Sequence, residues 1–397
     1  MSYDLGFLGG GQLARMSIQA AQRMGLKCLS LDPGGNTPAS QIADAAIGSL
    51  DDPEAIAQVF RKCAKVTLEN EFIPAQAIRD AQDLVGSPSP LVPGAEVLAT
   101  IQDKLLQRHA LLQAGVPSPK AVPLEGDGEG AAAKLGFPMV LKARFGGYDG
   151  KGTRYAKTEA DLGALKPEWQ SGGWLAEEFV PFRRELAAMV YLSEWGAGCF
   201  PTMETVQTNH VCDLVYPSGA DGSAIALAAV EAIGGYGLFG VEMFELDSGD
   251  ILVNEIAPRP HNTGHYTLDW GAVSQFEQHV RIAMGFPLAK PESYLPVCMA
   301  NLLGRTGEFN LVEATKAALS DGATRVHWYA KAEMRPGRKM GHINVVGHPA
   351  QPTMELVDRA VKARNRFLAQ PTSASPRSNP LSRRLPPEAE SGRIRTI

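Results

Sequence analysis

The chain has 397 residues, of which 44% are hydrophobic and 20% are charged. At about 100–200 residues per domain, this length allows two or three domains and excludes a single small module, a fibrous repeat or wholesale disorder. Lys and Arg (38) are outnumbered by Asp and Glu (43), so the formal net charge is −5, which argues against a nucleic-acid partner.

Cysteine usage and the lack of long apolar runs indicate where the protein works. The five cysteines are widely spaced and form no C-x-x-C pair, which is typical of reduced thiols and not of a disulfide framework or a zinc site. No basic region precedes the first apolar run, and no run approaches the roughly 18 apolar residues of a membrane span. We therefore expect a cytoplasmic protein with no membrane partner.

The first part of the chain alternates short apolar runs with helical patterns. Residues 5–8, 27–31 and 66–68 are expected to be strands, and residues 12–24 a helix that ends at Gly25. This alternation predicts a doubly wound, Rossmann-like α/β domain with a parallel sheet over residues 1–98.

The rest of the chain divides into three stretches. Residues 99–290 begin with a helix over 100–114 and continue with strands at 139–143, 174–180, 185–192, 240–246 and 251–256, which predicts an α+β domain with antiparallel pairing. Residues 291–370 are expected to form a small third domain. Residues 371–397 are rich in Pro, Ser and Arg, which predicts a disordered tail.

A first glycine-rich motif follows the first predicted strand. Residues 9–14 match G-x-G-x-x-A between a strand and a helix, and Asp32 follows the second strand, as in dinucleotide-binding domains. Taken alone, this motif favours an NAD-dependent dehydrogenase. The alternatives are a tight turn of a doubly wound domain or a site for a phosphate-bearing substrate.

A second glycine-rich segment, residues 145–152, follows a strand that carries Lys142 and Arg144. Four glycines and a lysine in such a loop allow backbone amides to wrap phosphate oxygens, although no G-K-[ST] completes a Walker A motif. The alternative is a plain hairpin turn. Farther on, Glu177 and Glu178 end an apolar strand, where they could bind adenine and ribose or lie at a solvated strand end.

Two glutamates on adjacent predicted strands point to a metal. If Leu246 faces Ile251 across the hairpin loop 247–250, Glu242 lies directly opposite Glu255. Because opposed like charges destabilise an antiparallel pair, a cation between them is expected, and Mg²⁺ prefers such oxygen ligands together with phosphates. Asn254 could add a carboxamide. A slip of one residue in the register would break this pairing.

Two further segments carry cations. Arg259 and His261 follow the second of these strands, where they could hold a second anionic substrate instead of lying in an ordinary loop. Lys331, Arg335, Arg338 and Lys339 lie close together in sequence, which favours a phosphate clamp over a solvated basic loop.

These motifs together resemble those of the 5-(carboxyamino)imidazole ribonucleotide synthases, an ATP-grasp family of de novo purine biosynthesis. The resemblance covers about residues 3–368, through residues 9–13, 146–152, 254–262 and 338–342. It implies a three-domain ATP-grasp fold, with the nucleotide and metal site in residues 99–290. The implied reaction joins bicarbonate to 5-aminoimidazole ribonucleotide while ATP is cleaved to ADP and phosphate. The family also suggests a homodimer.

The resemblance assigns roles by motif position. The ATP contacts are Lys104, Lys142, Gly146, Gly147, Tyr148, Asp149, Gly150, Lys151, Gly152, Glu177, Glu178, Phe179, Val180, Glu185, His210, Asn254 and Glu255. The contacts to the imidazole ribonucleotide are Tyr148, Asp149, Lys151, Arg259, His261, Lys331 and Arg338. Mg²⁺ falls to Glu242 and Glu255, in agreement with the hairpin register. Asp149, Lys151 and His261 are the candidate catalytic residues, and Asp149 or His261 would take the amine proton.

The chain departs from the family pattern at a few positions. Lys104 stands where an arginine is common, Ala330 replaces a glycine before Lys331, and Asn70 and Phe72 alter an acidic segment. With the resemblance, the first glycine-rich turn would serve the substrate domain, and Asp32 becomes an ordinary strand-end acid. The alternatives are another ATP-grasp carboxylate–amine ligase, an NAD-dependent dehydrogenase and, least favoured, a binding protein without catalysis.

Overall fold

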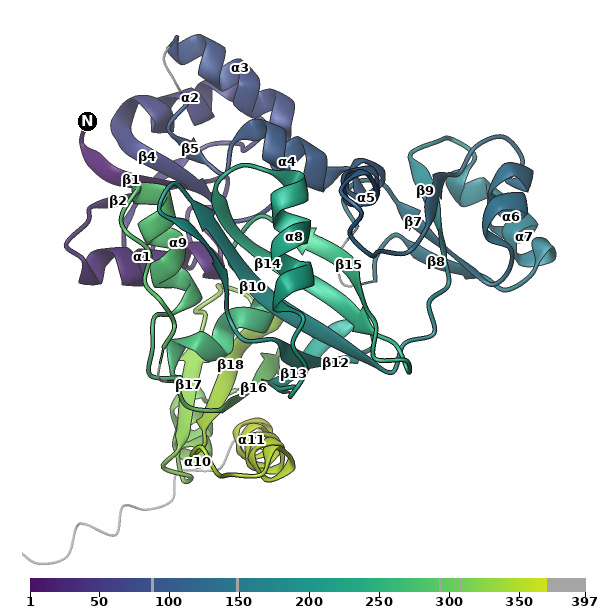
Figure 1. The fold of residues 1–397 in the computed structure, drawn as a ribbon. Helices are drawn as coiled ribbons and strands as arrows, with labels where there is room; N and C mark the ends of the chain where they lie inside the picture. Colours follow the sequence, from purple (N-terminus) through teal and green to yellow (C-terminus); the bar gives the residue numbers. More distant parts are fainter. Residues whose placement is uncertain (87–88, 148–149, 293, 308, 370–397) are drawn as a thin grey trace, which may run out of the picture.

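The computed structural model describes residues 1–86, 89–147, 150–292, 294–307 and 309–369. The predicted tail at 371–397 lies outside the described residues, as do Tyr148 and Asp149. Figure 1 shows a parallel sheet and a long antiparallel sheet lying together, with a small sheet extending to one side.

The N-terminal region is a parallel sheet in the order β3-β2-β1-β4-β5, which confirms the doubly wound prediction. Its elements are β1 (Tyr3–Leu8), α1 (Gln12–Arg23), β2 (Cys28–Asp32), β3 (Asp44–Ile47), α2 (Pro53–Lys62), β4 (Cys63–Leu68), α3 (Ala75–Val85) and β5 (Leu91–Val92). Strands β3 and β5 are not among the predicted strands: β3 is largely exposed, and β5 has only two residues. Helices α2 and α3 cover one face of the sheet, and α1 covers the other together with the distant α9 (Gln275–Met284).

The predicted helix over residues 100–114 is wrong as a single element. The structure has two helices, α4 (Ala95–Gln102) and α5 (Lys104–Gln113), separated at Asp103. The Asp103 carboxylate accepts a hydrogen bond from the Leu105 N–H at 3.0 Å and also binds the guanidinium of Arg144. This N-cap begins a new helix and ties it to the end of β7 (Met139–Ala143).

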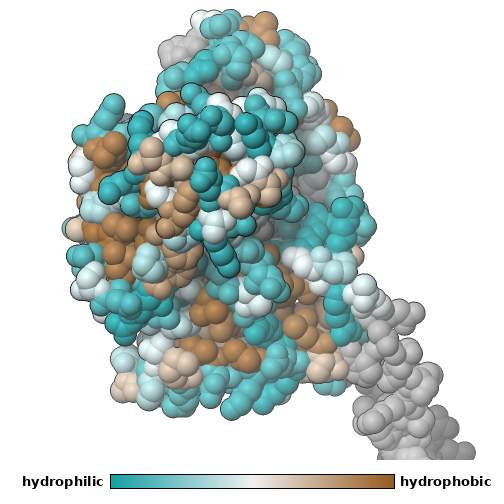
Figure 2. All heavy atoms as spheres, turned by 90° about the vertical axis from the view of Figure 1, so that its right-hand side faces the viewer, coloured by the Kyte–Doolittle hydropathy of each residue, from teal (hydrophilic) through white to brown (hydrophobic). Residues whose placement is uncertain are grey.

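The small sheet has the order β6-β9-β7-β8 and its own core around Trp169 and Leu141. Its elements are β6 (Ala121–Pro123), α6 (Glu129–Leu135), β7 (Met139–Ala143), β8 (Thr153–Ala156), α7 (Glu159–Trp169) and β9 (Trp174–Glu178). Figure 2 views the molecule from this side and shows brown apolar patches among hydrophilic surface. Phe145 and Phe179, beside this sheet, are exposed.

The long sheet has nine strands in the order β15-β14-β10-β12-β13-β16-β18-β17, with β11 paired to β10. Its elements are β10 (Arg184–Ser193), β11 (Gly196–Cys199), β12 (Met203–Thr208), β13 (Val211–Pro217), α8 (Ser223–Ile233), β14 (Gly237–Glu245), β15 (Ile251–Ala257), the 3-10 helix η1 (Asn262–Leu268), α9 (Gln275–Met284), β16 (Val297–Leu303), α10 (Leu311–Ala318), β17 (Thr324–Trp328), β18 (Lys339–Val346) and α11 (Thr353–Leu368). Helix α8 packs on β10, β14 and β15, and helices α10 and α11 pack on β16 and β18. The C-terminal strands therefore continue the central sheet through the β13–β16 pair, across the boundary predicted near residue 290.

Candidate active site

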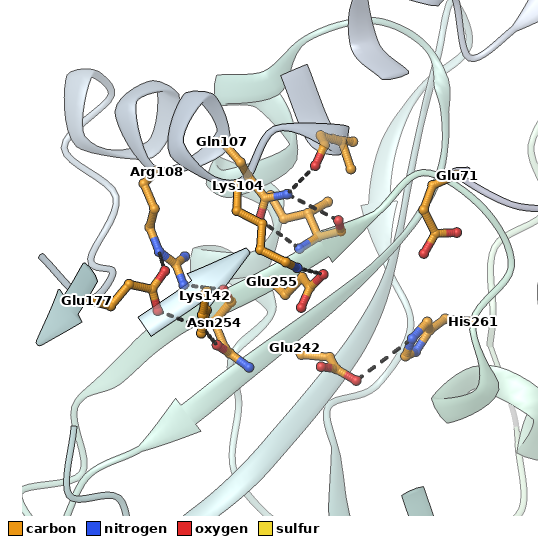
Figure 3. A network of polar contacts seen from close by, with 12 residues as sticks. Glu71, Lys104, Gln107, Arg108, Lys142, Glu177, Glu242, Asn254, Glu255 and His261 are labelled. Atoms are coloured by element: carbon orange, nitrogen blue, oxygen red, sulfur yellow. Dashed lines mark hydrogen bonds and ion pairs between the residues drawn. The ribbon is translucent and has the colours of Figure 1, made fainter. Parts of the chain in front are cut away.

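Helix α5 turns a polar face toward the protein interior. Lys104, Gln107 and Arg108 have the spacing of one helix face, and all three line a small pocket between α5, β7, β9 and β15. Gln107 and Arg108 are buried, whereas Leu106 and Leu112 of the same helix are exposed. Lys142, Glu177, Asn254 and Glu255 complete the pocket (Figure 3).

Sequence reasoning missed Gln107 and Arg108. Two features of the sequence could have indicated them. Lys104, Gln107 and Arg108 are spaced as one helix face, and the leucines of this helix do not share a face. A single helix over 100–114 does not place Lys104 at a helix start, and so does not indicate a polar face that is turned inward. The structure brings both residues together with five of the predicted ATP residues.

A buried charge network holds the pocket together. The Glu177 carboxylate binds Arg108 Nε at 2.8 Å and Lys142 Nζ at 2.6 Å. Burial by itself would raise the pKa of Glu177, but Arg108 and Lys142 outweigh it and lower that pKa to about 2. Lys142 Nζ also donates to Asn254 Oδ1 at 3.3 Å, and burial lowers the pKa of Lys142. Glu177 thus orients Lys142, on the strand that precedes the second glycine-rich segment.

The hairpin of β14 and β15 places Glu242 directly opposite Glu255, as predicted, although the predicted register at the turn is wrong. Leu246 bonds Asp250 and not Ile251, so the loop has three residues, 247–249, with Gly249 at φ +88°. A β-bulge between Glu242 and Met243 then shifts the register by one residue and restores the pairing. The extra residue, Asn254, lets both Asn254 and Glu255 reach the site while Val253 and Ile256 stay in the core.

The two opposed glutamates differ in their surroundings. Glu255 forms an ion pair with Lys104, whereas Glu242 has no ion pair with a lysine or arginine among the described residues. Burial, followed by the charges of Glu255 and Glu185, raises the pKa of Glu242 to about 7. A divalent cation at this position would relieve that repulsion, so the carboxylate pair suits Mg²⁺.

Arg259 and His261 follow the end of β15, and Figure 3 shows the ring of His261 turned toward Glu242. His261 Nε2 is 3.8 Å from Glu242 Oε1, and its Nδ1 is 2.9 Å from Thr263 Oγ1. Burial, aided by the charges of Arg259 and Lys339, lowers the pKa of His261 well below 6.5, so its ring is neutral. Arg259 is held by both oxygens of Glu71, with Nη2 at 2.6 Å from Oε1.

The second glycine-rich segment reaches the turn between β12 and β13. A Cβ on Gly150 would lie 2.7 Å from the Cβ of His210, so only glycine allows this approach. Asn209 and His210 both have positive φ and form a two-residue hairpin turn. His210 acts electrostatically on Glu185, whose pKa is raised by burial. The structure therefore brings together Gly150, Glu185 and His210, while Lys151 is exposed beside them.

The segment predicted to meet adenine lies at the end of β9. Glu178 Oε1 accepts a hydrogen bond from the Lys120 N–H at 2.9 Å, and Phe179 is 44% exposed. Val180 is half-buried. With Glu177 already committed to two cations, contacts of this segment with adenine stay a prediction.

Lys331 and Arg338 lie in the connection between β17 and β18. Lys331 Nζ is 5.7 Å from the centre of the Tyr329 ring, and its charge acts on Glu69 of the N-terminal region. The carbonyl of Ala330 accepts a hydrogen bond from Gln41 at 2.8 Å. Arg338 donates to the Glu333 carbonyl at 2.8 Å. Lys331 therefore faces the N-terminal region. A phosphate clamp between that region and the β17–β18 connection requires a cation in this place.

The first glycine-rich turn holds carboxylates of the chain itself. Glu69 is buried and accepts a hydrogen bond from the Leu13 N–H, at the start of α1, at 3.3 Å. Asp32 accepts from the N–H of Gly10 at 2.9 Å. An anionic ligand at this helix end would meet both acids, so the dinucleotide interpretation has no support here.

Two general features of the described residues bear on the predictions. No helix among them is long and apolar enough to cross a membrane. Within the same residues, no three His, Cys, Asp or Glu side chains are gathered as a metal-binding group.

The chain matches three family models along its length. Residues 2–102 match the ribonucleotide synthetase preATP-grasp domain, residues 109–276 match the ATP-grasp domain, and residues 297–355 match the phosphoribosylaminoimidazole carboxylase C-terminal domain.

Relatives and solved structures agree with these matches. N5-carboxyaminoimidazole ribonucleotide synthase of Synechococcus elongatus is 38% identical over 86% of this chain and 89% of its own length. Phosphoribosylaminoimidazole carboxylase of Ogataea methanolica is 39% identical over 87% of this chain, which spans 66% of that relative's length, just under two thirds. The crystal structure of N5-carboxyaminoimidazole synthase from Aspergillus clavatus, in complex with ADP and 5-aminoimidazole ribonucleotide, matches with a TM-score of 0.83 at 30% identity, covering 92% of this chain and 99% of that one.

Proposed function

The chain belongs to the N5-carboxyaminoimidazole ribonucleotide synthase family of ATP-grasp enzymes, and on that premise we propose that it carboxylates 5-aminoimidazole ribonucleotide with bicarbonate, while ATP is cleaved to ADP and phosphate. The observation that carries this proposal is the pairing of Glu242 with Glu255 beside Lys104 and Lys142. Glu255 lines the same pocket as the two lysines, and a pair of acids beside two lysines suits the transfer of a phosphoryl group.

The predicted roles of the pocket residues are carried forward. Lys104 and Lys142 contact the ATP phosphates, and residues 146–152 cover them. Glu242 and Glu255 would hold Mg²⁺, which supplies positive charge to the transferring phosphoryl group. Since Lys104 forms an ion pair with Glu255, ATP phosphates would compete with that glutamate for the lysine.

Bicarbonate is a poor electrophile, so the first proposed step activates it. A bicarbonate oxygen attacks the γ-phosphorus, the bond from that phosphorus to the β-γ bridging oxygen breaks, and carboxyphosphate and ADP form. The exocyclic amine of the ribonucleotide then attacks the carboxyl carbon, directly or after release of carbon dioxide. Phosphate leaves with the C–O bonding pair, and the amine loses a proton. Closure of residues 146–152 would keep water from hydrolysing the intermediate.

Asp149 and His261 remain the two candidates for the amine proton, and His261 is the one that lies among the described residues. Its ring is neutral and can accept a proton, and Nε2 faces Glu242 at 3.8 Å. Asp149 lies outside the described residues and stays a candidate by motif position. Arg259, Lys331 and Arg338 would bind the ribonucleotide, with the last two on its 5′-phosphate.

The test measures ADP and phosphate release with Mg²⁺ and ATP, with and without the ribonucleotide, and with bicarbonate stripped or supplied. We expect release that the ribonucleotide stimulates and an acid-labile carboxylated product that requires bicarbonate. Glu255→Gln should abolish both, and Glu231→Gln on the exposed side of α8 is the control. Turnover with a different amine would keep an ATP-grasp ligase and reject the purine substrate.

The assembly and compartment follow the resemblance. We propose a homodimer in the cytoplasm, which sedimentation of the purified chain and cell fractionation would test. A monomer at micromolar concentration would contradict the first part.

A further inference from the structure

The segment that carries His261 is gripped by three buried amide side chains from three different elements. They are Gln275 on α9, Asn301 on β16 and Asn344 on β18, and each is at most 1% exposed. Asn301 exchanges two hydrogen bonds with the side chain of Asn262, and Asn344 Nδ2 donates to the His265 carbonyl at 3.1 Å. Buried amides that bind one short segment fix its main chain, because each unmade bond would be costly.

Gln275 makes the contacts nearest to the site. Its Oε1 accepts the His261 N–H at 2.9 Å, which fixes the orientation of the amide, since a backbone N–H can only donate. Nε2 therefore donates, to the His261 carbonyl at 2.9 Å and to His265 Nδ1 at 2.8 Å. Both peptide groups that flank the Cα of His261 are thus held by one side chain.

The ring of His261 has little freedom once its main chain is fixed. A Cβ on Gly240 would lie 2.5 Å from the Cβ of His261, so the histidine packs directly on β14 two residues before Glu242. Thr263 holds Nδ1, and Nε2 is left facing Glu242 (Figure 3). The position of Nε2 therefore depends on where Gln275 holds the backbone.

We propose that Gln275 is a positioning residue that holds the main chain of His261 so that Nε2 stays aimed at the reaction site beside Glu242. This inference rests on the proposed function, in which His261 meets the ribonucleotide amine. A displacement of about 1 Å at such a group can lower a rate by as much as 10²-fold. We expect a smaller loss, roughly tenfold in kcat, because Thr263 and Gly240 still restrain the ring.

The chain offers a matched control on the same helix. Gln278 is also fully buried, and its amide clamps Ala289 in the same manner, accepting from the N–H and donating to the carbonyl, both at 3.1 Å. Gln275→Met and Gln278→Met each remove a buried amide of equal size. A purely structural role predicts equal losses of melting temperature and of activity in the two variants.

Two measurements separate the roles. The first is kcat and KM for ATP and for the ribonucleotide. The second is the NMR signal of the His261 ring, assigned with His261→Asn. We expect Gln275→Met to lower kcat about tenfold with the KM for ATP within twofold of the wild type, and to shift the His261 signal. Gln278→Met should leave the signal and kcat unchanged. Equal kcat losses, or an unmoved His261 signal in Gln275→Met, would overturn the proposal.

A second variant covers the case in which Gln275→Met does not fold. Gln275→Glu keeps an acceptor for the His261 N–H but removes both donated bonds, so it should also shift the His261 signal and lower kcat. If the Gln275→Glu protein keeps the wild-type signal and rate, positioning by the donated bonds is rejected. If the wild-type protein does not turn over the ribonucleotide, the proposed function fails, and the NMR comparison still decides whether Gln275 positions His261.

Discussion

The two glycine-rich segments look alike in sequence, but the structure surrounds them differently. At residues 9–11 the glycines lie against carboxylates of the chain itself, and a Cβ on Gly11 would meet Glu69 Oε1 at 2.2 Å. In the second segment, a Cβ on Gly147 would lie 3.7 Å from Lys104 Cε, and one on Gly150 would lie 2.7 Å from the Cβ of His210. No described atom lies within 4 Å of a Cβ placed on Gly146.

This difference shows what glycine alone cannot indicate. Glycine permits the close approach of some other group, but the charge of that group decides whether an anion can bind. In the first turn Glu69 already accepts the N–H of Leu13 at the start of α1. Beside the second segment, the single negative charge of Glu177 is paired with two cations, Arg108 and Lys142. Net positive charge therefore remains near these glycines.

The largest effect is expected when a positive charge beside the second glycine-rich segment is removed. Lys142→Ala removes a charge from the strand that precedes the second segment, and we expect kcat/KM to fall roughly 10²–10³-fold, as when one preorganised donor to a reacting group is lost. Lys65→Ala, on an exposed position of β4, is the control and should be neutral. Steady-state ADP release measures both, and Lys142→Ala within threefold of wild type would place the chemistry elsewhere.

The next effect concerns stability at the first segment. Gly11→Ala would force the Glu69 carboxylate away from its hydrogen bond, and such overpacking costs about 1–3 kcal/mol of the free energy of unfolding. Gly94 begins α4 with nearly the same backbone angles, and no described atom lies within 4 Å of its Cβ position, so Gly94→Ala should cost less than about 1 kcal/mol. Denaturant unfolding measures both. Weakened ADP binding by folded Gly11→Ala would instead give this turn a ligand.

A third effect is the pH dependence of Mg²⁺ binding at Glu242. The pKa of Glu242 is raised to about 7, so below that pH the carboxyl is protonated in the metal-free protein and Mg²⁺ must displace the proton. Apparent Mg²⁺ affinity should therefore fall roughly fivefold from pH 7 to pH 6. Calorimetric titration with ATP present measures it, and Glu242→Gln should bind weakly with little pH dependence. An equal pH dependence in that variant would assign the proton to another group.

The smallest effect lies where the family pattern has a glycine and this chain does not. Ala330 has φ +56°, a conformation that costs a residue with a Cβ about 1 kcal/mol. Ala330→Gly should therefore raise the free energy of unfolding by up to about 1 kcal/mol, less the entropy that glycine adds to the unfolded chain. Asn209→Gly is the comparison, because asparagine tolerates its φ of +52° and should gain less. A lower melting temperature for Ala330→Gly would contradict this account.

The sequence predicted most of what depends on local pattern. The parallel N-terminal sheet followed from alternating apolar runs and helical periods, and the strands 139–143 and 251–256 were placed within a residue of their observed ends. The Glu242–Glu255 pair was also predicted, although the hairpin turn was misplaced by one residue. Two one-residue differences, a shorter loop and the bulge at Asn254, offset each other. The roles given to Tyr148, Asp149 and the other site residues stay predictions.

The sequence by itself determined most of the elements and the family motifs, because these depend on residue type and short spacing, whereas the opposed glutamates also needed the β-bulge. Tertiary structure alone decided which charges meet. Asp103, which divides a helix, is paired with Arg144. Arg108 enters the pocket because it pairs with Glu177 of the small sheet. Gln275 binds the main chain of His261 from helix α9. Such contacts join residues far apart in the chain, and the free energy of pairing buried polar groups depends on the partner that folding brings near, which no local pattern specifies.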